Sequence, residues 1–133
     1  MAYQKSLVDA LGMGHEIKPL INSERDFDEF GKVVLDILEN YRESPPRLKI
    51  FKGVYGDFDR KETLYYIRKP ERETYAKMID DFKMHYGINV KKPMKRTEIA
   101  RHNKVSRQVI NNRLNYVLAV LSKHKRDIWY DML

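Results

Sequence analysis

The chain has 133 residues, of which 42% are hydrophobic and 34% are charged, and it contains no cysteine. This length and apolar fraction suit one domain, or a domain with an appended arm, that folds around its own core. The missing cysteine excludes disulfide scaffolds, thiol nucleophiles and cysteine-ligated zinc sites. The longest apolar run, Tyr116–Leu121, is far too short to span a membrane, so we expect a cytoplasmic protein.

The net charge of +7 is concentrated in the second half of the chain. Residues 1–66 carry 10 basic and 12 acidic residues, whereas residues 67–133 carry 16 and 7. Residues 91–126 hold 11 basic residues against Glu98 alone, a net charge of +10. Such a one-sided stretch predicts a polyanionic partner, of which nucleic acid is the commonest, with a solvated surface as the alternative.

The N-terminal part predicts two helices. A short one is expected around Leu7–Leu11, and apolar residues at helical spacing predict a longer one over Glu24–Glu43. Ser23 stands at its N-cap position, and the proline pair at Pro45 prevents its continuation. Its apolar face, Phe27–Tyr41, favours burial in the core, with a homodimer interface or an RNA polymerase docking surface as alternatives.

Residues 47–69 have an ambiguous pattern. Their β-branched and aromatic residues predict a two-stranded hairpin around Gly56. A helical turn at Leu64–Ile67 is the alternative.

A further helix is predicted from Pro70 to Tyr86. Proline and carboxylates favour its first turn, and Gly87 favours its end. Its apolar face comprises Tyr75, Met78, Ile79, Phe82 and Tyr86. A basic loop, residues 89–96, follows.

Residues 97–123 predict two helices joined by a tight turn. Thr97 and Ser106 stand at N-cap positions, and Ile99 and Ala100 are expected to face inward. Asn103 lies in the turn and tolerates the left-handed conformation that a turn requires. The expected core stripe of the second helix is Ile110, Leu114, Val117 and Leu121.

Four carboxamides gather on the other side of this second helix. Gln108, Asn112 and Asn115 lie on the face opposite the core stripe, and Asn111 lies at the margin of that opposite face. Carboxamides are mediocre helix formers, but they can pair with the N6 and N7 edge of adenine in the major groove. This pattern favours base recognition, and a helical hairpin with an amide-rich outer face is the alternative.

These segments resemble region 4 of bacterial sigma factors, the helix-turn-helix that reads the −35 promoter element. The resemblance covers residues 70–123 and rests on Pro70-Glu71-Arg72-Glu73, Tyr86-Gly87, Glu98-Ile99-Ala100, Val105-Ser106 and Ile110-Asn111-Asn112-Arg113-Leu114. Lys104 departs from it, at a turn position that is often glycine, and no segment of residues 1–69 resembles the region 2 helices that bind the −10 element. What remains resembles small sigma-like phage regulators, which implies sequence-specific regulation of transcription with RNA polymerase.

The expected fold is therefore mainly α, with an N-terminal block over residues 1–69, a helix-turn-helix over 70–126 and a tail over 127–133. Double-stranded DNA is the expected partner and no cofactor or metal is expected. The tail, Ile128–Leu133, either packs back or forms an interface through Trp129. The predicted DNA-binding residues are Lys91, Lys92, Lys95, Arg96, Thr97, Arg101, Lys104, Ser106, Arg107, Gln108, Asn111, Asn112 and Asn115.

Two other binding functions and an enzyme are the rival hypotheses. A small terminase subunit would form a ring of many copies, and a polymerase-binding inhibitor would act without touching DNA. An enzyme has the least support, because His15, His85, His102 and His124 are scattered. The neighbours Asp80 and Asp81 diverge on a helix and are expected at a solvated edge.

Overall fold

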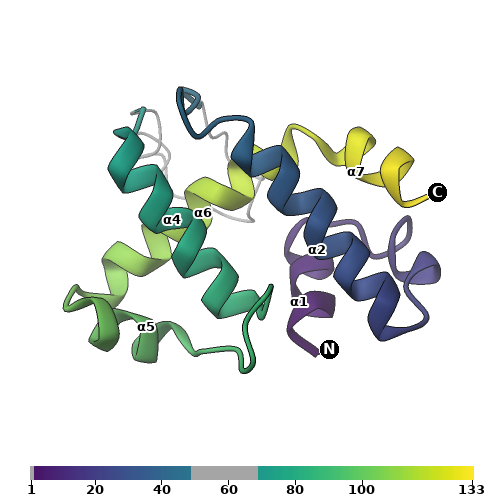
Figure 1. The fold of residues 1–133 in the computed structure, drawn as a ribbon, viewed down its shortest axis with the longest axis horizontal. Helices are drawn as coiled ribbons and strands as arrows, with labels where there is room; N and C mark the ends of the chain where they lie inside the picture. Colours follow the sequence, from purple (N-terminus) through teal and green to yellow (C-terminus); the bar gives the residue numbers. More distant parts are fainter. Residues whose placement is uncertain (1, 49–68) are drawn as a thin grey trace.

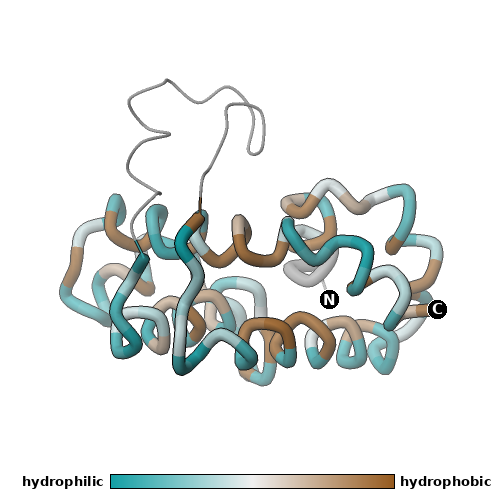
Figure 2. Tube along the Cα trace, turned by 90° about the horizontal axis from the view of Figure 1, so that it is seen from above, coloured by the Kyte–Doolittle hydropathy of each residue, from teal (hydrophilic) through white to brown (hydrophobic). Residues whose placement is uncertain are grey.

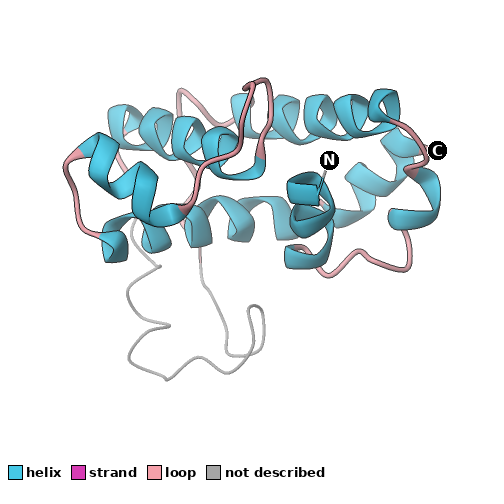
Figure 3. Ribbon diagram, turned by 90° about the horizontal axis from the view of Figure 1, so that it is seen from below, coloured by secondary structure: helices cyan, strands magenta, loops and turns pink. Residues whose placement is uncertain are grey.

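The computed structural model of the protein describes residues 2–48 and 69–133, with side chains from Ser6 onward. The described ranges form six α-helices and one short 3-10 helix and contain no strand (Figures 1 and 3). The prediction of a mainly α fold is confirmed. The hairpin predicted around Gly56 lies outside the described residues.

The first two helices pack their apolar faces inward. α1 (Ala2–Ala10) leads through the 3-10 helix Lys18–Leu20 to α2 (Glu24–Glu39). The predicted N-cap is confirmed, because Ser23 Oγ accepts the Asp26 N–H at 3.3 Å. α2 ends four residues before the predicted Glu43. The N–H groups of Tyr41 and Arg42, just beyond its end, donate to the carbonyls three residues back.

The apolar face of α2 belongs to the protein's own core, as the first of the three sequence hypotheses expects. Its buried residues are Phe27, Phe30, Gly31, Val34, Ile37 and Leu38. These side chains are covered by the same chain and are not available to a second copy. Along the described helices hydrophobic and hydrophilic residues alternate, as in amphipathic helices (Figure 2).

α4 (Arg72–Tyr86) follows the prediction to within two residues at its start. It ends where Gly87 adopts a left-handed conformation with φ +74°. A Cβ at Gly87 would lie 2.8 Å from Pro93 Cγ, so both the backbone and the neighbouring loop require glycine there. The sharp reversal sends the chain directly into the basic loop.

α6 (Arg107–Ser122) is central to the described fold and contacts α2, α4 and α5. Its predicted core stripe, from Ile110 to Leu121, is confirmed as buried. Every residue of Tyr116–Leu121 is buried, on all sides of the helix, whereas the first two turns of α6 are partly exposed. The protein therefore encloses one half of this helix and presents the other.

Two buried phenols tie this core to the end of α2 and to the segment that follows it. Tyr75 donates a hydrogen bond to the Leu38 carbonyl at 2.7 Å, and Tyr116 donates one to the Pro46 carbonyl. Burial raises the pKa of both phenols well above the ordinary value for tyrosine. Both therefore stay neutral and keep donating at physiological pH.

The last helix, α7 (Lys125–Met132), packs against α2. Its Ile128 is buried, while Trp129 is 36% exposed and Tyr130 is 59% exposed. Thus the tail packs back through Ile128 and the partly buried Met132 and presents its aromatic residues to solvent. The three-part division of the chain stays a prediction. Within the described residues, no helix combines the length and the apolar character needed to cross a membrane.

Candidate nucleic-acid interface

The candidate interface begins with the turn between α5 (Arg96–Asn103) and α6. Lys104 caps α5 in the left-handed conformation, with φ +55°, and the Val105 N–H donates to the Ala100 carbonyl at 3.0 Å. The prediction that Asn103 occupies the left-handed position is wrong by one residue. Asn103 remains helical, and its side-chain amide donates to Asp81 at 2.6 Å, so the reversal falls on the next residue.

Of the two predicted N-caps, one is confirmed and one is wrong. Ser106 Oγ accepts the Val109 N–H at 3.2 Å and caps α6 as expected. α5 begins two residues earlier than predicted, with Lys95 as its N-cap, which places Thr97 inside the first turn. The Glu98 carboxylate accepts the Lys95 N–H at 3.4 Å, and this bond fixes the earlier start.

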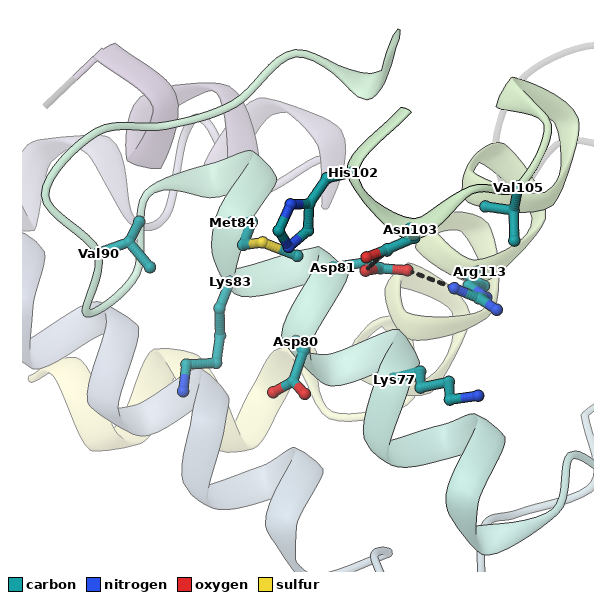
Figure 4. A pocket seen from close by; sticks show the side chains of 10 residues that line it. All are labelled: Lys77, Asp80, Asp81, Lys83, Met84, Val90, His102, Asn103, Val105 and Arg113. Carbon is teal, nitrogen blue, oxygen red and sulfur yellow. Dashed lines mark hydrogen bonds and ion pairs between the residues drawn. The ribbon is translucent and has the colours of Figure 1, made fainter. Parts of the chain in front are cut away.

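Asp81 of α4 holds α5 and α6 together, and its expected place at a solvated edge is wrong. It is 1% exposed and accepts hydrogen bonds from Asn103 Nδ2 at 2.6 Å and Arg113 Nη1 at 2.9 Å. Figure 4 shows the carboxylate pointing toward both partners at the wall of a groove of about 490 Å³. On a helical wheel Asp81 lies about 60° from Met78, a signal that separates it from the exposed Asp80.

The left-handed lysine gives a test of the turn. Replacing Lys104 by glycine is expected to raise the free energy of unfolding by about 1 kcal/mol, because glycine has no Cβ to strain a positive φ. Thermal or urea unfolding measures the change, and Lys104→Ala, which keeps the Cβ, is the matched control and should show no gain. A glycine variant no more stable than the alanine variant would contradict the turn described here.

The four predicted amides divide into two groups. Gln108 is exposed and donates from Nε2 to Asn112 Oδ1 at 3.1 Å, while Asn111 Oδ1 accepts from Arg96 Nη1 at 2.9 Å. Asn115 lies apart, in a hollow of about 420 Å³ that it shares with residues at the end of α1 and the start of α7. Three of the four amides therefore lie in the first two turns of α6, where Gln108 is bonded to Asn112 and Asn111 to Arg96.

The predicted cations also divide by exposure. Six of the seven are exposed: Lys91, Lys92, Lys95, Arg101, Lys104 and Arg107. Arg96 is half-buried between α4 and α6, where it binds Asn111 and lies beside the Tyr86 phenol. In Figure 1, α5 runs along one edge of the molecule, between the α4–α5 loop and the turn into α6. The exposed cations thus lie on consecutive segments of the chain, which are the α4–α5 loop, α5, the turn and the first residue of α6.

The basic loop is anchored to α4 at Met94. Its N–H donates to the Met84 carbonyl at 2.8 Å, and its carbonyl accepts from His85 Nδ1 at 3.0 Å. Burial of the imidazole lowers the pKa of His85, with a smaller contribution from Arg96 in the same direction, and the Met94 carbonyl opposes it. The described part of the chain holds no group of three side chains suited to bind a metal ion.

Comparison of the chain with protein-family models, with curated proteins and with solved structures found no match in any of the three.

Proposed function

We propose that the protein is a sequence-specific, double-stranded-DNA-binding regulator of transcription that acts with RNA polymerase in the manner of a small sigma-like factor. In this proposal α5, the turn at Lys104 and α6 form a helix-turn-helix, and α6 is the recognition helix. The resemblance of residues 70–123 to sigma region 4 is one ground for this proposal.

The observation that carries the proposal is the exposed start of α6. Ser106 caps it, three amides are held in its first two turns, and no acidic residue lies between Ile99 and His124. A helix N-terminus attracts phosphate, amides suit base edges, and exposed lysine and arginine suit the DNA backbone. These three features together favour a surface that enters a duplex groove. A face that is merely solvated gives no reason for them to occur together.

The proposal is tested by selecting bound sequences from random duplex DNA with the full chain, with and without RNA polymerase. We expect one enriched sequence family. On the selected duplex, Arg107→Ala should weaken binding about tenfold, because Arg107 begins the recognition helix. The matched control is Arg25→Ala, an exposed arginine at the start of α2, which should bind as the unchanged protein does.

Three results would contradict the proposal. Equal loss of affinity in the two arginine variants would indicate that DNA is attracted by the overall charge and not bound at a specific site. A ring of many copies would favour DNA packaging. Association with polymerase that needs no DNA and survives replacement of both Asn111 and Asn112 by alanine would favour an inhibitor.

A further inference from the structure

The bond between Gln108 and Asn112 is more exposed than the bond between Asn111 and Arg96, which also lies at the start of α6. The residues lie one helical turn apart, and Gln108 Nε2 donates to Asn112 Oδ1 at 3.1 Å. Gln108 is exposed and Asn112 is half-buried, so the pair extends from the helix surface toward solvent. By contrast, the Asn111 amide accepts a partly buried hydrogen bond from Arg96.

This bond changes what the Gln108 amide can offer to another molecule. A glutamine side chain has two N–H donors and one carbonyl acceptor. Because one N–H is committed to Asn112, one donor and one acceptor remain, side by side. In the orientation that this bond has, the amide nitrogen of Gln108 faces Asn112.

The remaining pattern complements adenine and opposes guanine. In the major groove adenine offers an acceptor at N7 and a donor at N6, whereas guanine offers acceptors at both N7 and O6. An unrestrained glutamine can turn both of its N–H groups toward guanine. A glutamine with one N–H already committed would place its carbonyl oxygen against guanine O6, and the two oxygens repel.

We infer that Gln108 reads one adenine of the target duplex and that Asn112 is the positioning residue that makes this reading selective against guanine. The inference rests on the proposed function, since it assigns roles at the same surface. A structural role for Asn112 alone would change stability and overall affinity but not the preference for one base at one position.

The experiment measures the ratio of dissociation constants for the selected duplex and for the same duplex with a single adenine changed to guanine. The relevant adenine is the one whose preference is lost in Gln108→Ala. In the unchanged protein we expect a ratio of about 10 to 100. Asn112→Ala should reduce it to about 2 or 3, and Asn112→Asp, which keeps the accepting Oδ1, should preserve it even though its charge weakens binding to both duplexes.

The ratio compares two duplexes on the same protein sample, so a partly unfolded variant does not distort it. Asn40→Ala, an exposed asparagine at the end of α2, is the matched control and should keep the full ratio. An unchanged ratio in Asn112→Ala, a lost ratio in Asn112→Asp, or no adenine position that depends on Gln108 would overturn the inference while DNA binding stands. Failure of the unchanged protein to bind any duplex would overturn the proposed function, and the inference with it.

Discussion

Replacing Asp81 by alanine is expected to lower the free energy of unfolding by about 3 to 5 kcal/mol. The carboxylate side chain is 2% exposed and its partner Arg113 is 14% exposed, so the variant leaves a cation and the Asn103 amide without their acceptor inside the protein. Removing one partner of a buried ion pair is costly for this reason. Urea unfolding followed by circular dichroism measures the loss.

The neighbouring aspartate supplies the control for this prediction. Asp80 is exposed, and Asp80→Ala should change the free energy of unfolding by less than about 0.5 kcal/mol. The double variant Asp81→Leu with Arg113→Met removes both charges and should recover most of the loss. Equal stability of the two single alanine variants would show that Asp81 does not hold α5 and α6 together.

The second large effect concerns salt. If the six exposed cations meet phosphates, the logarithm of the binding constant should fall with the logarithm of the salt concentration at a slope of about −5. Affinity for duplex DNA should then drop about a thousandfold between 50 and 200 mM salt. Fluorescence anisotropy with a labelled duplex, titrated at several salt concentrations, measures the slope.

Single substitutions show which cations contribute to that slope. Arg101→Gln and Lys104→Gln should each reduce its magnitude by about 1, because each removes one phosphate contact. Lys32→Gln, on the exposed side of α2, should leave it unchanged. A binding constant that does not vary with salt would exclude the DNA hypothesis.

Much of the fold could be predicted because helices and their ends follow local rules. The apolar residues of α2, α4 and α6 recur at helical spacing, and their predicted core positions are buried except for Tyr41 and Met78, which are partly buried against the core. Ser23, Ser106 and Gly87 lie at helix ends where their chemistry is favoured. Local rules do not take tertiary contacts into account. The end of α2, which comes earlier than its apolar pattern predicts, is one position where they fail.

The errors at the candidate site have a common cause, which is tertiary contact. Asn103 has the side chain suited to a left-handed turn, but its bond to Asp81 keeps it helical and moves the turn to Lys104. On a wheel Asn115 aligns with Gln108, yet it lines a hollow together with residues at the end of α1 and the start of α7. A periodic pattern gives the direction of a side chain but not the segment that meets it.

The enclosure of Tyr116–Leu121 has a mechanical consequence for the other end of the same helix. α6 cannot rotate about its axis unless six apolar side chains repack together, so the direction in which Gln108 points is determined by the core. Val120 lies about 18 Å along the helix axis from Gln108. A change of side-chain volume at Val120 would tilt or rotate the first turn of α6. The packing of the core thereby determines the direction in which the Gln108 amide points.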